Sequence, residues 1–331
     1  MKDVAVFGAG RIGKIHAGNV AKQRGARLKY VVDPDGAAAT ALADAHGAKV
    51  ASVDQVFADA SVGVVVICSS TDTHADLIER AAAAGKAIFC EKPVDLSLER
   101  ARKVAASVKR AGVPCLIGFQ RRHDPTFAAA KARLAAGEIG TPEMLIITSR
   151  DPGAPPLEYL KRSGGIFRDM LIHDFDVFRW ILEDDAVSVH ATGSVLTDPT
   201  VAQADDVDST AVTIRSRSGK LAQINTSRRA AYGYDQRFEV LGSKGMLQSG
   251  NHRPTEVVAW TGKSVSCDLP EHFFLERYRA AYASEMAHFF EALEGGKPMR
   301  TTIDDGVAAL ELADAATISW REQRIVSLPL K

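Results

Sequence analysis

The feature that most constrains the fold of this 331-residue chain is a glycine-rich loop near its start. The segment Gly8-Ala9-Gly10-Arg11-Ile12-Gly13 follows the apolar run Val4–Phe7 and opens a helical stretch from Arg11 to Gln23. In such a loop the first glycine permits a tight turn, the second lets the backbone approach a pyrophosphate, and the third allows close helix–strand packing. Because the helix N-terminus also favours negative charge, the loop is predicted to bind the phosphates of a dinucleotide. The residues expected at that cofactor are Gly8, Gly10, Arg11, Ile12 and Gly13.

The order of elements after the loop predicts a parallel sheet. The run Val62–Cys68 is continuously apolar, as expected of a strand buried on both faces. Strand-like and helix-like segments alternate as far as Gly118, so residues 1–120 are predicted to form a doubly wound, Rossmann-type α/β domain. The expected strands are Val4–Phe7, Leu28–Val32, Val62–Cys68, Ala87–Cys90 and Pro114–Gly118, and the expected helices are Arg11–Gln23, Pro34–His46, Thr73–Ala84 and Ser97–Ala111.

Beyond residue 120 the pattern changes. Several β-type stretches follow one another without helices between them, which predicts an α+β domain over residues 121–331 with a large, mostly antiparallel, open-faced sheet. Because an open sheet with an uncovered apolar face usually finds a partner, we expect a homo-oligomer, dimer or tetramer, formed through that sheet. The expected strands are Glu143–Arg150, Val187–Leu196, Ser209–Arg217, Leu221–Ser227, Gln236–Gly242 and Glu256–Trp260; the expected helices are Pro125–Ala136, Asp169–Leu182, Phe273–Glu294 and Ile303–Trp320, of which the last two are free to pack back on the first domain.

Charge and composition argue against several classes of protein. Basic and acidic residues balance at 41 each, and no run of Lys and Arg is longer than a pair, so neither nucleic acid nor an anionic membrane surface is an expected partner. No apolar run approaches the ~20 residues of a membrane span, and the N-terminus carries no signal-peptide pattern, so a cytoplasmic protein is expected. The four cysteines show no CxxC spacing; we interpret them as free thiols and expect no metal site.

Asp33 indicates which dinucleotide would bind. It ends the second predicted strand, twenty residues after Gly13, where a carboxylate accepts hydrogen bonds from the adenosine ribose hydroxyls. The same carboxylate repels a 2′-phosphate, so NAD is favoured over NADP, although Arg11 would oppose that preference by attracting a phosphate. The alternative is a Rossmann-like fold that binds another nucleotide or none.

Lys92 stands directly after the predicted strand Ala87–Cys90. In an open α/β sheet, ligands bind outside the carboxyl ends of the strands, which places Lys92 where the nicotinamide is expected. An ammonium group there can stabilise the oxygen of a reacting hydroxyl, with Pro93 stiffening its turn. The alternative is an ordinary solvated loop lysine.

A polar stripe marks one helix of the second half. Asp169, His173 and Asp176 have the i, i+4, i+7 spacing of one helix face, and the opposite face carries Leu171, Phe175, Phe178 and Leu182. A carboxylate beside an imidazole fixes its tautomer and supports proton transfer. A surface helix whose Asp169 caps the N-terminus is the alternative, and a metal site on these residues is disfavoured because it offers a single histidine.

Two tyrosines, Tyr232 and Tyr234, follow a β-stretch in the segment RRAAYGYD. Their hydroxyls are suited to contacting a polyol; tyrosines packed at a sheet interface are the alternative reading.

Taken together, these motifs resemble the glucose–fructose oxidoreductase/inositol dehydrogenase (Gfo/Idh/MocA) family along essentially the whole chain. The resemblance rests on GAGRIG, CSSTDTHADLI, CEKP, GFQRRHDPTF, GGIFRDMLIHDFD and AYGYDQRFEVLGSKG, and the segments TSRDPGAPP, IHDFD and SRRAAYGYDQR resemble the inositol-oxidising members. It implies that Lys92, Asp169 and His173 form a catalytic triad in which His173 takes the hydroxyl proton, Asp169 supports His173 and Lys92 orients the hydroxyl. It also implies polyol contacts from Asp176 and Tyr232, and cofactor contacts from Ser69, Thr71, His74, Glu91, Lys92 and Gln120.

The sequence departs from the family pattern at three places. Ser69-Ser70 stands where relatives have Thr-Pro, Gln120 stands where Asn is usual, and Leu171 replaces a Thr. Leu171 is expected to point to the packed face, whereas Gln120 lies near the cofactor–substrate junction and leaves the preferred substrate open. The resemblance implies NAD-dependent oxidation of a cyclic polyol, with myo-inositol as the leading candidate, another inositol isomer or an aldose as the runner-up, and a non-catalytic NAD-binding sensor as the rival from a different class.

Overall fold

The computed structural model describes residues 1–330, which divide into two units. The first unit comprises Met1–His123 and Ala281–Leu310; the second comprises Asp124–Ala280 and the chain from Glu311 onward. The first unit therefore includes a segment from the C-terminal part of the chain. No helix within residues 1–330 combines the length and the apolar character that a membrane span requires.

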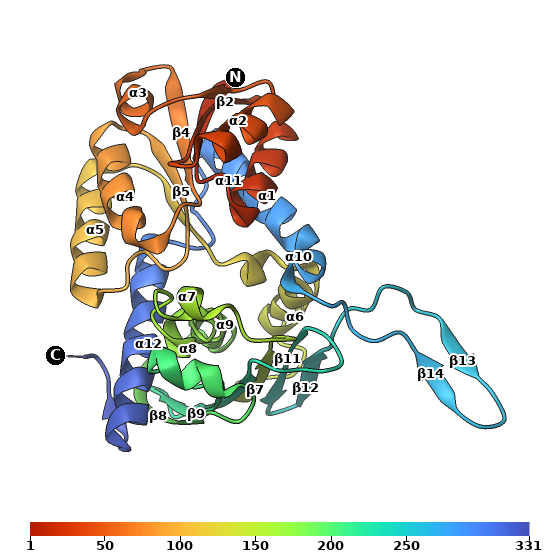
Figure 1. Ribbon diagram of the computed structural model, residues 1–331. Coiled ribbons are helices and arrows are strands. Elements are labelled where there is room, and N and C mark those ends of the chain that lie inside the picture. The colour runs from red at the N-terminus through yellow and green to blue at the C-terminus, as the bar shows by residue number, and fades with distance from the viewer. Residues whose placement is uncertain (331) are drawn as a thin grey trace. The chain divides into compact units, whose positions relative to one another are not determined.

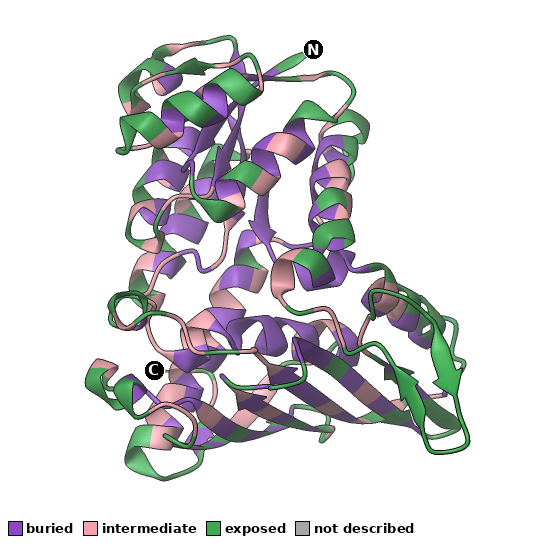
Figure 2. Cartoon of the chain, turned by 45° about the vertical axis from the view of Figure 1, so that its right-hand side comes forward, coloured by how far each residue is buried: buried purple, intermediate pink, exposed green. Residues whose placement is uncertain are grey.

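The first unit is built on a parallel sheet whose strand order, among its described residues, is β3-β2-β1-β4-β5-β6. Neighbouring strands of this sheet pair in parallel throughout the described residues. The central strands are buried on both faces, as in Val64–Ile67, where exposure is 0–1%, and Figure 2 shows this burial along the strands. The Rossmann-type sheet predicted from the apolar runs is confirmed. Its strands are β1 (Lys2–Phe7), β2 (Ala26–Val32), β3 (Lys49–Val50), β4 (Val62–Ile67), β5 (Ala87–Glu91) and β6 (Cys115–Gly118); its helices are α1 (Arg11–Ala21), α2 (Gly36–Ala45), α3 (Val53–Ala58), α4 (His74–Ala83), α5 (Leu98–Ala111) and most of α11 (Arg279–Gly295), together with the start of α12 (Ile303–Glu322).

Aromatic packing explains why the late segment belongs to the first unit. Met286, Phe289 and Phe290 of α11 lie in the same hydrophobic cluster as the residues of β1 and β4. The rings of Phe89 and Phe289 meet edge to face at 5.8 Å, a favoured aromatic geometry. Burial of these apolar side chains stabilises the return of the chain onto the sheet.

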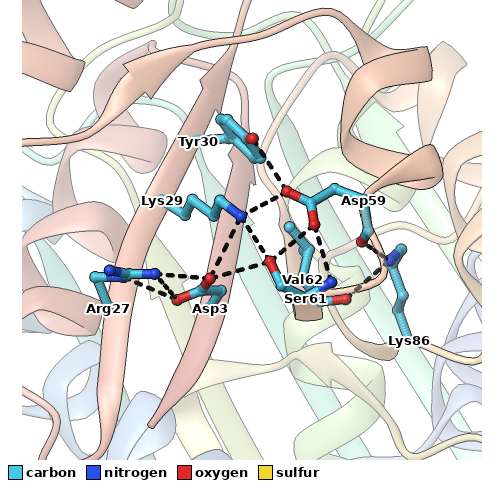
Figure 3. Close-up of polar contacts among 8 residues, drawn as sticks. All are labelled: Asp3, Arg27, Lys29, Tyr30, Asp59, Ser61, Val62 and Lys86. Atoms are coloured by element: carbon cyan, nitrogen blue, oxygen red, sulfur yellow. Dashed lines mark hydrogen bonds and ion pairs between the residues drawn. The ribbon is translucent and has the colours of Figure 1, made fainter.

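A polar network closes the amino-terminal edge of this sheet (Figure 3). Asp3 at the start of β1 accepts two hydrogen bonds of 2.8 Å from Arg27 at the start of β2. Lys29 donates to Asp59 at 2.6 Å, and the buried Lys86 ammonium donates to the carbonyl oxygen of Asp59 at 2.9 Å. The hydrogen bond from Lys29 is the largest cause that holds the pKa of Asp59 below its ordinary value. The network ties β1 and β2 to the turn before β4, at the edge opposite the glycine loop.

The second unit contains a mixed sheet with the order β12-β11-β7-β10-β9-β8-β15 among the described residues. β7 and β10 pair in parallel and the other neighbours are antiparallel, so the prediction of a large, mostly antiparallel sheet is confirmed. Its strands are β7 (Pro142–Arg150), β8 (Ala186–Ser194), β9 (Ser209–Ser216), β10 (Leu221–Ser227), β11 (Asp235–Gly242), β12 (Gly245–Ser249) and β15 (Val326–Ser327).

Helices cover one face of this sheet. Side chains of α6 (Pro125–Ala135), α9 (Ile172–Leu182) and the C-terminal part of α12 share one hydrophobic cluster with alternate residues of the strands. In β9 the burial alternates residue by residue, which is the pattern of a strand with one covered face. Figure 2 shows the resulting bands of buried and exposed residues across the sheet. The remaining short helices of the unit are α7 (Leu157–Leu160), α8 (Ile166–Asp169), the 3-10 helix η3 (Pro199–Ala204) and α10 (Phe274–Arg277).

Apart from the helix predicted over Asp169–Leu182, which is interrupted after Asp169, two expected elements differ in the structure. The predicted strand Glu256–Trp260 is limited to β13 (Val258–Trp260), which pairs with β14 (Val265–Cys267) in a separate hairpin instead of joining the large sheet. This hairpin projects from the second unit in Figure 1, and its strand residues are exposed. The predicted helix Phe273–Glu294 is divided into α10 and α11, with Tyr278 between them.

Candidate active site

The glycine loop lies at the carboxyl end of β1 and is constrained by close backbone contacts. Gly8 has φ +98°, and a Cβ there would lie 2.5 Å from the carbonyl oxygen of Cys68. A Cβ on Gly13 would lie 1.9 Å from the carbonyl oxygen of Gly8, so the turn closes only with glycine at both positions. A Cβ on Gly10 would meet nothing within 4 Å, and Gly10 is the N-cap of α1 with no side-chain cap. The first and third glycines therefore shape the turn, while the second leaves open space at a helix N-terminus, which fits a dinucleotide pyrophosphate.

Asp33 follows β2 and is tied to this loop. Its Oδ2 accepts a hydrogen bond of 2.6 Å from the amide of Ala9, and its Oδ1 accepts one of 2.8 Å from the amide of Asp35. Each carboxylate oxygen has a further lone pair for a ribose hydroxyl. The carboxylate is thus fixed beside the glycine loop, as the predicted role requires.

Four loops of the first unit meet at one sheet edge because they follow the carboxyl ends of parallel strands. They carry the glycine loop after β1, Ser69 and Thr71 after β4, Glu91 and Lys92 at the end of β5, and Gln120 after β6. Thr71 begins the short helix η1 (Thr71–Thr73), and the 4%-exposed Gln120 begins η2 (Gln120–His123). The structure brings the predicted cofactor-side residues to the edge where open α/β sheets bind their ligands.

Glu91, which precedes Lys92, is held by a histidine that sequence reasoning missed. His16 of α1 is fully buried, and its Nε2 lies 2.7 Å from Glu91 Oε1. The His16 ring packs on Phe89 at 4.6 Å and on Tyr282 at 5.6 Å. On the other side, a Cβ on Gly118 would lie 3.1 Å from the Glu91 carboxylate. The residue next to the predicted catalytic lysine is therefore enclosed on several sides.

His74 joins two of these loops from behind. Its ring is 1% exposed, with Nδ1 2.8 Å from the carbonyl oxygen of Pro93 and Nε2 3.0 Å from that of Ser69. Burial lowers the pKa of His74, and a neutral ring donates only one of these two bonds. Because its ring is buried between these carbonyl groups, His74 fixes the Ser69 loop and the Lys92-Pro93 loop relative to each other.

In the second unit the helix predicted over Asp169–Leu182 is interrupted. Asp169 is the last residue of α8, and α9 begins at Ile172. The amide of Leu171 bonds to the carbonyl of Ile166, five residues back, so the helical register changes between Asp169 and His173. The apolar face is confirmed: Leu171, Phe175, Phe178 and Leu182 are 0–1% exposed in the core.

Asp169 receives donors from two other segments. Tyr159 Oη donates to its Oδ1 at 2.8 Å, and Arg228 Nη2 donates to its Oδ2 at 3.1 Å. Desolvation of the hydroxyl and the nearby Asp169 carboxylate raise the pKa of Tyr159, although 48% of that residue is exposed, so its hydroxyl remains a donor. Arg228 and Tyr159 were not among the predicted site residues. Arg228 begins the segment RRAAYGYD, in which only the two tyrosines were predicted to contact a substrate.

The other predicted substrate residues differ in accessibility. His173 is 9% exposed and Asp176 is 0% exposed, both on α9. Tyr232 is 37% exposed; its hydroxyl donates to Asp235 at 2.6 Å and accepts from Arg150 at 2.9 Å. Tyr234 is 6% exposed and packs edge to face on Tyr278, which supports the packing interpretation for that residue.

Comparisons with known proteins cover both units. The family described as "Oxidoreductase family, NAD-binding Rossmann fold" matches residues 2–119, and the "GFO/IDH/MocA C-terminal domain" matches residues 127–248. An inositol 2-dehydrogenase of Rhizobium meliloti (strain 1021) is 50% identical over 323 residues, 98% of each chain.

Solved structures agree with these matches. The crystal structure of a putative myo-inositol dehydrogenase from Sinorhizobium meliloti 1021 has a TM-score of 0.96 at 49% identity, covering 99% of this chain and 100% of that one. A scyllo-inositol dehydrogenase from Lactobacillus casei, with bound cofactor NAD(H) and scyllo-inositol, has a TM-score of 0.92 at 28% identity and 99% coverage of both chains. With family matches on both units and a relative aligned over nearly its whole length, this chain belongs to the Gfo/Idh/MocA family of NAD-binding oxidoreductases.

Proposed function

We propose that this protein is an NAD-dependent inositol dehydrogenase that oxidises myo-inositol to its 2-keto form. The observation that carries the proposal is the 50% identity, over 98% of both chains, to an inositol 2-dehydrogenase. Lys92, Asp169 and His173 are all present, which argues against a sensor that only binds NAD. A scyllo-inositol substrate is the second candidate, because a relative was solved with that isomer bound.

In this proposal, two residues act on the proton of the reacting hydroxyl and one acts on its oxygen. His173 accepts the proton of the hydroxyl being oxidised, and Asp169 supports the imidazole in that role. The Lys92 ammonium hydrogen-bonds to the same oxygen and stabilises the charge that develops on it. Asp176 and Tyr232 orient the ring through its other hydroxyls.

NAD is the cofactor for which the first unit is suited. When bound, the nicotinamide C4 takes up the hydride that leaves the ring carbon. Gly8, Gly10, Arg11, Ile12 and Gly13 hold the pyrophosphate, and Asp33 contacts the adenosine ribose. Ser69, Thr71, Glu91, Lys92 and Gln120 line the same edge of the sheet toward the nicotinamide, with His74 fixing their loops from behind.

A substrate panel tests the proposal. Myo-inositol, scyllo-inositol, other inositol isomers and aldoses are each incubated with NAD and with NADP, and reduced nicotinamide is followed by its absorbance. The expected result is the fastest turnover with myo-inositol and NAD. Turnover confined to scyllo-inositol or an aldose would select the runner-up, and none with any polyol or sugar would favour the sensor.

Two substitutions test the residue roles. Lys92→Ala and His173→Ala should each lower turnover by ~10²–10⁴-fold, because each removes a group acting on the reacting hydroxyl. Lys103→Ala on α5 and His190→Ala on β8 are matched controls, since both side chains are exposed outside the site. Near-normal rates in either test variant would remove that residue from the mechanism.

We also propose that the protein is a cytoplasmic homo-oligomer, dimer or tetramer, assembled through the open face of the large sheet. Leu221, Leu241 and Met246 are 40%, 43% and 49% exposed on its strands. Light scattering after gel filtration should show a multimer, and Leu241→Glu should reduce its mass. A wild-type monomer would refute this assembly.

A further inference from the structure

A buried arginine lies directly behind the predicted catalytic aspartate. Arg228 follows β10, its side chain is 1% exposed, and its Nη2 lies 3.1 Å from Asp169 Oδ2 and 3.9 Å from Asp206 Oδ2. Its main-chain amide also donates to the carbonyl oxygen of Asp208 at 2.8 Å. The guanidinium is therefore a buried charge set between two carboxylates and fixed at its backbone.

The second carboxylate connects Arg228 to the turn that starts the site. Asp206 Oδ1 accepts a hydrogen bond of 3.0 Å from the amide of Ile166, the first residue of α8. Gly165 has φ +83°, and a Cβ there would lie 3.2 Å from the same oxygen. Burial raises the pKa of Asp206, while its backbone hydrogen bonds and Arg228 act in the opposite direction. Asp206 and Arg228 thus hold the two ends of α8, whose last residue is Asp169.

Asp169 accepts a hydrogen bond from a second side chain. The Tyr159 hydroxyl donates to its other oxygen at 2.8 Å, so each oxygen of this carboxylate has a donor from outside α8. Within the cluster, the Arg228 cation acts electrostatically on Tyr159 and on Asp206. Three further charged groups belong to the same unit: Asp151 acts electrostatically on Tyr159, and Arg168 forms an ion pair with Asp314 at 2.7 Å. An arrangement with a donor on each oxygen leaves the carboxylate one orientation.

We infer that Arg228 is a positioning residue of the reaction: it fixes the Asp169 carboxylate, and its charge sets the proton affinity of the Asp169–His173 pair. This inference rests on the proposed function, because it takes Asp169 and His173 as the proton-transfer pair. Asp206, 3.9 Å from the Nη2 that contacts Asp169, partly balances the charge of Arg228. A buried ion pair does not by itself indicate that its residues are there to stabilise the fold. We therefore interpret Arg228 as a residue that orients Asp169.

The sign of the electrostatic effect follows from charge. Removing the Arg228 cation stabilises a proton bound to the pair, so activity should be lost at a higher pH as the solution is acidified. Removing the Asp206 anion destabilises the same proton, so the acid limb of the pH–activity profile, where activity falls on acidification, should move to lower pH. Removing a charge a few ångströms away should shift the acid limb of the pH–activity profile by roughly one pH unit. A purely structural role predicts no opposed shifts.

The test measures kcat and kcat/KM against pH with saturating NAD for Arg228→Gln, Arg228→Lys and Asp206→Asn. We expect Arg228→Gln to lower kcat by ~10²-fold, within the range for loss of a group supporting proton transfer, with a smaller change in KM. Its acid limb should move to higher pH; Arg228→Lys should restore the limb because it keeps the charge, and Asp206→Asn should move it to lower pH. If Arg228→Gln does not fold, Asp206→Asn still decides the sign, and Arg228→Lys shows whether the charge alone is sufficient.

Arg277→Gln is the matched control, because it also removes a buried guanidinium from an ion pair. Arg277 and Asp124 also form a buried pair in the second unit, 2.5 Å apart with both side chains 1% exposed. This variant should lower the melting temperature and leave the pH profile unchanged. If Arg228→Gln and Asp206→Asn behave like Arg277→Gln, with lower stability and a wild-type pH profile, the inference is overturned.

A second readout does not require turnover. Histidine-labelled protein is titrated by NMR, with the His173 signal identified by its loss in His173→Asn. The His173 ring should titrate at higher pH in Arg228→Gln and at lower pH in Asp206→Asn. If the substrate panel shows no activity, the proposed function fails while this titration still decides the role of Arg228; unshifted His173 signals would refute it.

Discussion

A methyl group on Gly10 should separate folding from cofactor binding. Gly10 has φ −71°, which alanine adopts without strain, and an added Cβ would meet no protein atom within 4 Å. Gly10→Ala should therefore fold normally, with a stability equal to the wild type or higher by ~0.4–1 kcal/mol from the stiffer unfolded chain. The methyl would occupy the space through which the backbone approaches the pyrophosphate, so NAD affinity should fall.

Gly13→Ala provides the contrast within the same loop. Its Cβ would lie 1.9 Å from the Gly8 carbonyl oxygen, a clash that only a backbone shift relieves. Overpacking of this kind costs about 3 kcal/mol or more, which corresponds to a lower melting temperature by roughly 6–12 °C at ~2–4 °C per kcal/mol for a large domain.

Circular dichroism melts and calorimetric NAD titrations of both variants test the pair. Gly10→Ala should show a normal melt and weak binding, and Gly13→Ala an early melt. Wild-type NAD affinity in a well-folded Gly10→Ala protein would refute the assignment of this loop to the pyrophosphate.

Three further outcomes are expected. Asp33→Ser should weaken NAD binding and raise the use of NADP, and an unchanged cofactor preference in steady-state kinetics would contradict the ribose contact. Asp59→Asn should lower the urea midpoint at pH 7, because the hydrogen bond from Lys29 depresses the pKa of Asp59 in the folded protein. That stabilisation is present above the unfolded pKa of about 4 and is lost as pH falls through the lower folded value, so the two proteins should converge in acid; a constant difference would refute the linkage. The exposed Cys267 should react with a thiol reagent in the native protein, whereas burial raises the pKa of Cys115 to about 12 and should prevent its reaction; equal rates by mass spectrometry would contradict this.

The sheets were predictable because their signals come from long, regular burial. A run such as Val62–Cys68 has few folded environments other than the interior of a parallel sheet, and β4 occupies most of it. Short elements such as β3 and β15 have two residues each, too few for any period to appear. The stretch at Glu256 has β-type composition but no cover on either face, and composition alone does not distinguish a projecting hairpin from a sheet strand.

The interruption before α9 shows a different limit. The i, i+4 spacing of Asp169 and His173 predicted one continuous helix, since spacing carries no information about tertiary anchors. In the structure Arg228 and Tyr159 hold Asp169, while the core buries Leu171 completely two residues later. The anchoring of Asp169 and the burial of Leu171 coincide with the change of helical register between α8 and α9. The apolar face survives this change because it depends on burial more than on strict helical continuity.

Two of the residues that the sequence did not reveal, His16 and Arg228, share a physical property: each lies behind a predicted site residue. His16 supports Glu91, and Arg228 supports Asp169. Both are buried polar groups, and nothing in a sequence marks a histidine or an arginine as buried, since most polar side chains are exposed. Burial favours one orientation of each side chain, because turning it away would leave the carboxylate that it contacts without that partner. The chemistry-bearing residues of such a chain can therefore be predicted from motif and strand position, whereas the residues that hold them in place become apparent only from the packing of the fold.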